Sequence, residues 1–220
     1  MELTSSLEIR RAGPADVEAI ADAHLDSIRS IGAQYYTGVI VSDWGARVEG
    51  ALYVNAMARG EVFYIAVAEP GDKPEVLGFS SHRIDGKDHR TAVYVRGTAA
   101  RLGIGSALFR SAEAGAISAG ATSIHVAASL AAVEFYKANG FAEVGRGEHR
   151  LWSGRRMACV FMRKRISRCF RAFRVFRAFR GVVSALVMRQ PTREATAEHA
   201  LLTWPSVSTL MSDVRAAAAG

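Results

Sequence analysis

The sequence predicts one mixed α/β domain, in which a mostly antiparallel sheet is flanked by helices, followed by a basic tail. Three observations predict it: apolar residues at helical spacing near the N-terminus, β-branched segments separated by turn residues, and alternating helix and strand patterns after Gly97. The 220 residues suffice for one ordinary domain with a sizeable core. We therefore expect the domain to cover residues 1–166 and the tail to cover residues 167–220.

The N-terminal elements come first in this pattern. Residues 7–11 read as a short strand, and the segment Gly13-Pro14-Ala15-Asp16 carries the proline and the acid typical of a helix start. Apolar residues then recur at helical spacing, which predicts an amphipathic helix over 16–30. A second, less regular helix is expected over 43–58.

Three strands follow these helices. Residues 61–68 (EVFYIAVA) are apolar and β-branched enough for a buried strand, and residues 76–84 and 90–96 continue the strand pattern. Turn-forming residues lie in each gap, Glu69-Pro70-Gly71-Asp72 in the first and Asp85-Gly86-Lys87-Asp88 in the second. Two successive hairpins predict an antiparallel meander.

After Gly97 the pattern alternates between helix and strand. An Ala- and Leu-rich helix is expected over 103–119, a strand over 123–127, and a short helix over 130–138 that ends at the left-handed cap Asn139-Gly140. Two closing strands are expected over 141–145 and 156–162. The complete predicted order is β, α, α, β, β, β, α, β, α, β, β.

The net charge of +7 is unevenly distributed along the chain. Residues 1–166 hold 20 Lys and Arg against 18 Asp and Glu, a net charge of +2, whereas residues 167–220 hold 8 against 3, a net charge of +5. The basic balance therefore belongs mainly to the tail. No nucleic-acid partner is expected for residues 1–166.

The tail has a three-residue repeat in which arginine and phenylalanine recur from Arg168 to Arg180. This period drifts around a helix, and on a strand it alternates between faces, so neither structure segregates the two residue types. We interpret residues 167–220 as a weakly ordered low-complexity extension. The alternative is a tether, in which residues 167–190 make weak contact with an anionic membrane or nucleic acid.

Targeting and cysteine signals point to the cytoplasm. No apolar run approaches the roughly 18 residues of a membrane span, and the N-terminus lacks a basic-then-apolar signal pattern. The two cysteines, Cys159 and Cys169, cannot build a disulfide framework and give no metal-ligand spacing. We expect a reducing compartment and no bound metal.

A glycine-rich loop over residues 100–106 (ARLGIGS) follows a strand and opens a helix. Closely spaced glycines there let backbone N–H groups face a phosphate, where the helix dipole also favours an anion. A dinucleotide fingerprint would need a third glycine where Leu108 stands, and a Walker loop would need Gly-Lys-Ser/Thr. A glycine-rich helix start without a ligand remains the alternative.

Three further motifs lie on either side of this loop: Val93-Tyr94-Val95 before it, and residues 132–136 (AVEFY) and Asn139-Gly140-Phe141 after it. In this order and approximate spacing, and with the element order above, residues 7–166 resemble the GNAT superfamily of acetyl-CoA-dependent N-acetyltransferases. The resemblance implies a GNAT-like sheet that splays apart at its central strands. It also implies acetyl-CoA as the acetyl donor and an amine as the acceptor.

The resemblance also implies the site residues. The strand residues Val93 and Val95 would pair their backbone with the pantetheine arm, and Tyr136 would stand near the thioester sulfur as general acid. Ser129 takes a position that is often Asn in the family, and Ala100 stands where Gln or Arg usually begins the loop. The amides that would hold the pyrophosphate belong to Arg101, Leu102, Gly103, Ile104, Gly105 and Ser106.

The chemistry of acetyl transfer asks for the same parts. A lysine-like amine has a pKa of about 10.4 and must lose a proton before it attacks, whereas the departing thiolate must gain one. A tyrosine hydroxyl can return that proton, and the Val95 N–H is a candidate to polarise the carbonyl. Without the family pattern, Tyr136 would read as a packed residue of an amphipathic helix.

The base and the acceptor stay open. An acyl-cysteine route through Cys159 is disfavoured because this residue lies in an apolar strand, and a water relay would need no side-chain base. The candidate bases lie on or near the strands that border the site, and each also reads as an ordinary turn or sheet residue: His82, Asp85, Asp88, His89 and His125.

Tyr35, Tyr36 and Trp44 lie in the segment where the family binds its acceptor, and core packing explains them about as well. An aromatic wall there would suit a small-molecule or peptide amine, and polyamine, aminoglycoside, amino acid and protein amine all remain open. The function predicted is direct acetyl transfer to such an amine. The alternatives are a relative that binds acyl-CoA without turnover, which Ala100 and Ser129 motivate, and a protein that acts through its tail.

Overall fold

The computed structural model describes residues 7–68, 74–86 and 88–166. The interpretations of residues 167–220, as weakly ordered extension or as tether, lie outside the described residues. Among the described residues, no helix is long and apolar enough to cross a membrane.

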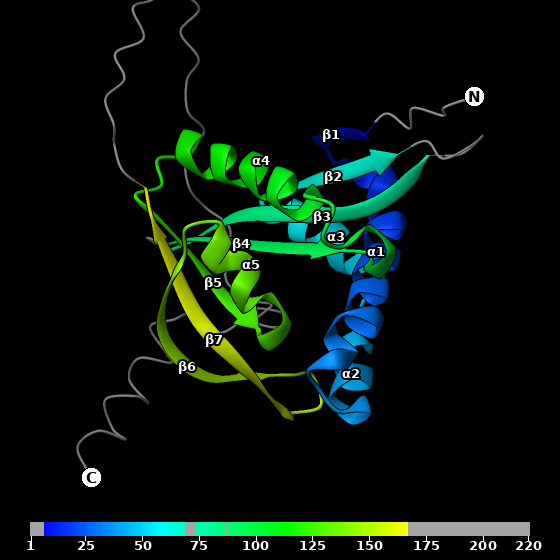
Figure 1. The fold of residues 1–220 in the computed structure, drawn as a ribbon. Helices are drawn as coiled ribbons and strands as arrows, with labels where there is room; N and C mark the ends of the chain where they lie inside the picture. The colour runs from blue at the N-terminus through cyan, green and yellow to red at the C-terminus, as the bar shows by residue number, and fades with distance from the viewer. Residues whose placement is uncertain (1–6, 69–73, 87, 167–220) are drawn as a thin grey trace, which may run out of the picture. The chain divides into compact units, whose positions relative to one another are not determined.

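The described residues form a seven-stranded sheet with the strand order β1-β2-β3-β4-β5-β7-β6 (Figure 1). Neighbouring strands run antiparallel except β4 and β5, which run parallel. The predicted meander is confirmed in β2, β3 and β4. The strands are β1 (Leu7–Arg11), β2 (Val62–Ala68), β3 (Glu75–Asp85), β4 (Asp88–Val95), β5 (Ser123–Ser129), β6 (Ala142–Arg150) and β7 (Arg156–Arg165).

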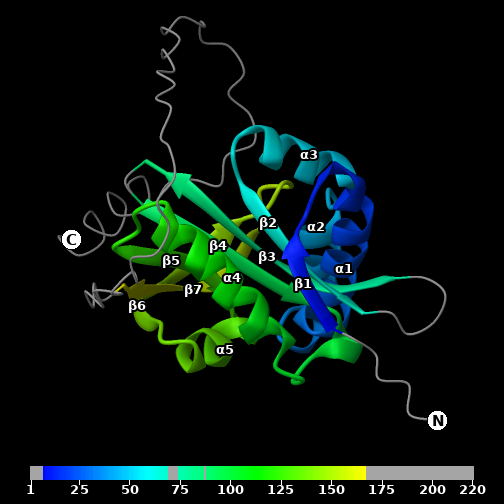
Figure 2. The same ribbon diagram turned by 90° about the horizontal axis from the view of Figure 1, so that it is seen from above.

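Helices cover both faces of the β1–β4 half of the sheet. Helix α4 (Ile104–Ser118) crosses one face, and α1 (Val17–Ser30) packs with α3 (Gly50–Ala58) on the other (Figures 1 and 2). The short α5 (Val133–Ala138) packs beside β5 and β6. Alternating strand residues supply the two cores: Ile65 and Phe79 pack toward α1, whereas Ala66 packs toward α4 with Leu108.

The single helix expected over 43–58 is wrong. The segment instead forms α2 (Gly38–Gly45) and α3, which are separated by a short turn. Glycine is a weak helix former, and Gly45 and Gly50 stand at the two ends of the break. A Cβ on Gly50 would also lie 2.0 Å from Glu18 Oε1 on α1, so the start of α3 packs closely against that helix.

The strand expected over 141–145 is longer than predicted, because β6 continues to Arg150. Every residue of β6 is exposed or half-buried. Because neither face of the strand is buried, its sequence does not alternate between apolar and polar residues, which is the pattern that predicts a strand. Pairing with β7 from Ala142 to Arg150 extends the strand.

The central strands separate, as the resemblance implied. Strands β4 and β5 are in register only at His89 with Ile124 and at Arg90 with His125. Beyond Arg90, β4 continues for five residues with β3 on one side and no paired strand on the other among the described residues. This gap between β4 and β5 positions the candidate site.

Candidate active site

The open edge of β4 presents the backbone of Val93 and Val95. In an antiparallel pair, alternate residues direct their N–H and C=O groups toward the partner strand. Arg96 donates its N–H to Leu77 O at 2.8 Å, so the even-numbered residues of β4 face β3. Val93 and Val95 therefore direct their N–H and C=O groups into the gap, where an extended ligand can hydrogen-bond with them.

The loop that follows β4 ends as an anion-binding helix start. Arg101 (φ +65°) and Gly103 (φ +82°) adopt left-handed backbone conformations that turn the chain into α4. Ala107 donates the bond to Gly103 O at 3.1 Å, so the N–H groups of the three residues before it have no acceptor within the helix. These N–H groups belong to Ile104, Gly105 and Ser106, and they can receive a phosphate.

Close packing holds this loop against β4 and α5. A Cβ on Gly105 would lie 3.0 Å from the Phe135 ring and 3.5 Å from Val95 Cγ2, so only glycine fits without displacing its neighbours. Asn139, which the sequence identified only as part of a helix cap, also donates its side-chain amide to Ser106 Oγ at 3.2 Å. Leu102 is 71% exposed, so its side chain lies at the surface of the loop.

The structure brings Tyr136 to the open edge of β4. The Tyr136 side chain is 3% exposed and packs between Phe135 and Phe141, with ring centroids 5.0 and 5.1 Å away. Burial raises the pKa of the Tyr136 hydroxyl well above its usual value, and the nearby Val93 backbone N–H opposes this rise only weakly. Tyr136 thus stays protonated at neutral pH, with its hydroxyl beside Val93.

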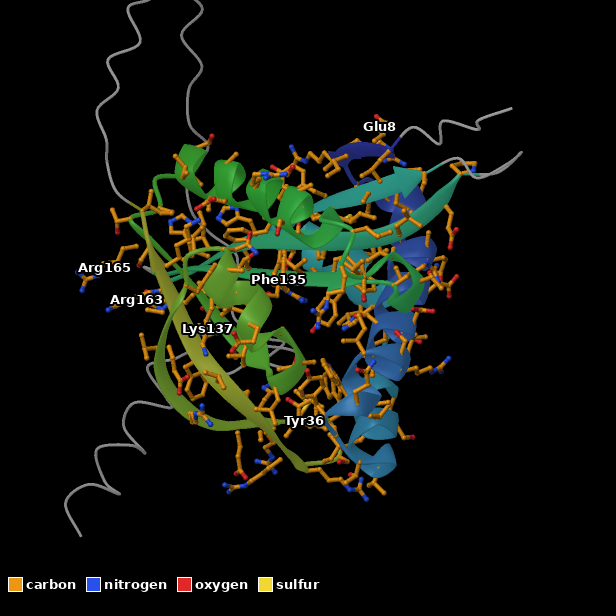
Figure 3. All side chains as sticks on the ribbon, viewed as in Figure 1. Glu8, Tyr36, Phe135, Lys137, Arg163 and Arg165 are labelled. Carbon is orange, nitrogen blue, oxygen red and sulfur yellow. The ribbon has the colours of Figure 1, made fainter. Side chains whose placement is uncertain are left out.

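Ser129 is the last residue of β5 and therefore lies across the gap from β4, the strand that leads to the glycine-rich loop. The residue after it, Leu130, donates its N–H to the Tyr36 hydroxyl at 2.7 Å. That hydroxyl donates in turn to Ala158 O on β7, also at 2.7 Å. Tyr36 therefore ties the segment between α1 and α2 to the β5–β7 half of the sheet (Figure 3).

Tyr36 begins a row of aromatic rings that reaches β4. The ring centroids of Tyr36 and Trp44 are 5.9 Å apart, and those of Trp44 and Tyr94 are 6.3 Å apart. Burial raises the pKa of Tyr94, and the Trp44 side chain beside it partly opposes this rise. Tyr35 is 49% exposed and makes no ring contact among the described residues, so the aromatic wall consists of Tyr36, Trp44 and Tyr94.

The five candidate bases divide between the two faces of the sheet. His82 and His89 are buried on the α4 face, where their rings stack and His82 Nε2 lies 3.0 Å from His89 Nδ1. Asp85 pairs with Arg90 Nε at 2.8 Å. The remaining candidates, Asp88 and His125, lie 3.7 Å apart.

Cys159 is a buried thiol on β7. It is 2% exposed, and burial raises its pKa to about 11. A thiol with so high a pKa is a poor nucleophile at neutral pH.

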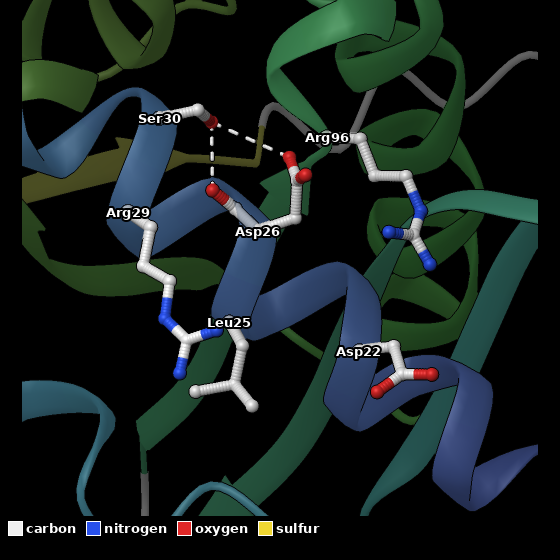
Figure 4. Close-up of a pocket in the computed structure, with 6 residues that line it drawn as sticks. All are labelled: Asp22, Leu25, Asp26, Arg29, Ser30 and Arg96. Carbon is white, nitrogen blue, oxygen red and sulfur yellow. Dashed lines mark hydrogen bonds between the residues drawn. The ribbon is translucent and has the colours of Figure 1, made fainter.

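A shallow pocket of about 420 Å³ lies elsewhere, beside α1 and the end of β4 (Figure 4). No predicted site residue lines it. Its Asp26 accepts the Gly97 N–H at 2.7 Å and so fixes the point where the chain leaves β4 for the glycine-rich loop. The lining residues are Asp22, Leu25, Asp26, Arg29, Ser30 and Arg96.

Comparison with known proteins agrees with this geometry. Residues 39–143 match the family model of the GNAT acetyltransferase domain. No curated protein matches the sequence.

Several solved structures share the fold. A GCN5-related N-acetyltransferase from Rhodopseudomonas palustris is 24% identical, with a TM-score of 0.63 over 76% of this chain and 99% of that one. The PaiA N-acetyltransferase from Thermoplasma acidophilum, solved with coenzyme A, is 18% identical, with a TM-score of 0.58 over 73% and 99%. YncA from Salmonella typhimurium, solved with acetyl-CoA, is 18% identical, with a TM-score of 0.55 over 74% and 95%.

The splayed sheet, the glycine-rich loop at the start of α4 and the family match over residues 39–143 lead to one conclusion. Residues 39–143 carry the acetyltransferase (GNAT) domain that the family model describes, in a fold shared with GCN5-related N-acetyltransferases.

Proposed function

We propose that the protein transfers an acetyl group from acetyl-CoA directly to a primary amine. The observation that carries this proposal is the edge of β4 at Val93 and Val95, which no strand of the described residues pairs and which leads to the open N-terminus of α4. An extended pantetheine arm suits the first feature and a pyrophosphate suits the second. Neighbouring GNAT structures solved with coenzyme A or acetyl-CoA support this assignment.

The cofactor residues take distinct roles in this proposal. Val93 and Val95 hydrogen-bond the pantetheine arm through their backbone groups. The amides of the loop from Arg101 through Ser106 bind the pyrophosphate, with Gly105 allowing close approach and Asn139 holding Ser106 in place. Ser129 borders the other side of the gap, at the end of β5.

Tyr136 acts as the general acid in this proposal. Acetyl-CoA would supply the acetyl group as a thioester whose thiolate leaves when the amine attacks. The Tyr136 hydroxyl is buried at the gap and stays protonated, so it can give its proton to the departing sulfur. The Val93 backbone N–H lies close enough to this hydroxyl to favour its ionised form, and so would help to stabilise the phenolate that remains.

The amine reaches the gap from the face opposite α4, where the aromatic wall of Tyr36, Trp44 and Tyr94 lies. A direct transfer fits this geometry better than an acyl-enzyme, because Cys159 is buried and its pKa is raised. His82 and His89 are buried on the α4 face, so the proton of the incoming ammonium leaves through a water relay or through His125 on the acceptor face.

The test is a turnover assay with the full-length protein, acetyl-CoA and a panel of primary amines, in which release of the coenzyme A thiol is followed. We expect thiol release that depends on the amine, together with a stoichiometric amount of N-acetylated product. Binding of acetyl-CoA without turnover across the panel would favour a non-catalytic acyl-CoA-binding relative instead.

A further inference from the structure

The face of the sheet that receives the amine can be followed strand by strand. Met162 and Val160 pack toward α5, and Lys164 forms an ion pair with Glu113 of α4 at 2.6 Å, so the even-numbered residues of β7 face these helices. Phe161 and Arg163 therefore point to the opposite face. By the same alternation, the acceptor face also carries Ala92, Tyr94, His125, Ala127 and Ser129.

This face is uncharged beside the gap and charged beyond it. Ala92, Tyr94, Ala127 and Phe161 offer apolar and aromatic surface near the reacting position. The charged side chains begin where β4 and β5 come together, at the cross-strand row Arg90, His125 and Arg163.

Most charges in this region are already paired. Asp85 pairs with Arg90 at 2.8 Å and lies 4.0 Å from Arg83, while Asp88 lies 3.7 Å from His125. Arg163 is half-buried and forms no ion pair or hydrogen bond with the other described side chains. Burial lowers the pKa of the His125 imidazole, and the nearby charge of Arg163 lowers it further.

We propose that Arg163 binds an anionic group, carboxylate or phosphonate, on the acceptor amine. The proposal rests on the proposed function, because it takes the gap beside Val93 as the place where the amine reacts. A guanidinium suits such an anion because it can donate two parallel hydrogen bonds. Asp85 and Asp88 already lie beside Arg90 and His125, so among the described residues of this face Arg163 is the unpaired cation nearer to the gap, with Arg165 two residues farther away.

The register sets the length of the acceptor. Arg163 aligns with His125 and Arg90, three residues from Val93 along β4. At about 3.3 Å per residue, this row lies on the order of 10 Å from Val93 along the strand, and the long Arg163 side chain can span part of that distance. The amine of a short α-amino acid lies too close to its own carboxylate, so the acceptor class is an amine joined to its anion by a chain of several carbons.

The experiment compares matched acceptors and matched variants of the full chain. The acceptors are glycine, ω-aminobutyrate, ω-aminovalerate, aminopropylphosphonate and uncharged pentylamine. The variants are Arg163→Gln and the control Arg165→Gln, which removes the same charge from the same strand and face two residues farther from Val93. Figure 3 labels both arginines at the end of β7.

We expect Arg163→Gln to raise KM for the long anionic amines by on the order of tenfold or more. KM for pentylamine and for acetyl-CoA should not change, and Arg165→Gln should resemble the wild type. A lower KM for the aminocarboxylates or for the aminophosphonate shows which of the two anionic groups Arg163 binds. Equal KM values for anionic and uncharged amines in the wild type would overturn the proposal.

A calorimetric titration separates this proposal from the proposed function. ω-Aminovalerate is titrated into the protein saturated with coenzyme A, for the wild type and both variants. Binding that Arg163→Gln abolishes, in a protein that acetylates no amine, would support the anion site and refute acetyl transfer. Acetylation of pentylamine, with ω-aminovalerate binding equal in all three proteins or absent, would refute the anion site alone.

Discussion

The Tyr136→Phe substitution probes the proposed chemistry with little disturbance of the fold. The phenylalanine ring keeps the contacts with Phe135 and Phe141, whose centroids lie 5.0 and 5.1 Å away, so only the hydroxyl is lost. The hydroxyl lies near the Val93 backbone N–H, and its loss should change the folding stability by no more than about 1 kcal/mol. The folded population should therefore stay near that of the wild type.

The catalytic effect should be much larger than the effect on stability. Loss of a positioned general acid lowers kcat by on the order of a hundredfold, equivalent to about 2.7 kcal/mol of barrier. The assay is steady-state release of coenzyme A with the best acceptor, alongside calorimetric binding of acetyl-CoA, which should stay close to wild type.

Tyr53→Phe is the matched control. Tyr53 is equally buried, and its hydroxyl is 2.7 Å from His24 Nδ1 in the core between α1 and α3, away from the gap. The control should lose stability but keep kcat. Equal kcat for Tyr136→Phe and the wild type, under conditions where the chemical step limits the rate, would refute the role of Tyr136.

Three further predictions follow from packing and burial. Gly105→Ala should raise KM for acetyl-CoA severalfold and leave KM for the amine unchanged, because the new Cβ meets the Phe135 ring at 3.0 Å; Gly38→Ala, with open space around it, should have no effect. Cys159→Ala should keep at least half of kcat, since the buried thiol takes no part in direct transfer, and loss of activity in a folded variant would argue for an acyl-cysteine. Stability should fall as pH drops from about 6.5 toward 3, because the unfolded chain protonates His24 near its usual pKa whereas burial lowers the folded pKa to about 3. The midpoint of urea unfolding should decrease over this range in the wild type and less so in His24→Gln.

The sequence predicts most of the fold because local signals and burial agree there. The three strands of the meander have apolar runs bounded by turn residues, and the cap at Asn139 and Gly140 is confirmed by a φ of +87° at Gly140. The break between α2 and α3 is different, because its only local signals are the glycines at its ends, Gly45 and Gly50, within an otherwise apolar segment. The contact of Gly50 with Glu18 on α1 is long-range and leaves no local pattern.

In the candidate site, too, local motifs could be predicted from the sequence, whereas long-range contacts could not. The glycine-rich loop and Tyr136 belong to short motifs, and their spacing is visible in the sequence. Tyr36 contacts residues 94 and 122 positions away, so its hydrogen bonds to Leu130 and Ala158 could not be read from the chain. The position of Arg163 relative to the gap depends on the register of β4, β5 and β7, which the sequence alone does not give.

The central claim is that the open edge of β4 and the start of α4 together bind acetyl-CoA. Calorimetric titration of acetyl-CoA into the full-length protein tests it most directly, with an adenosine bisphosphate that lacks the pantetheine arm as the comparison. The geometry predicts micromolar binding of acetyl-CoA and much weaker binding of the truncated nucleotide, because Val93 and Val95 hold the arm. Absence of acetyl-CoA binding by the folded protein, or equal affinity for both ligands, would contradict it.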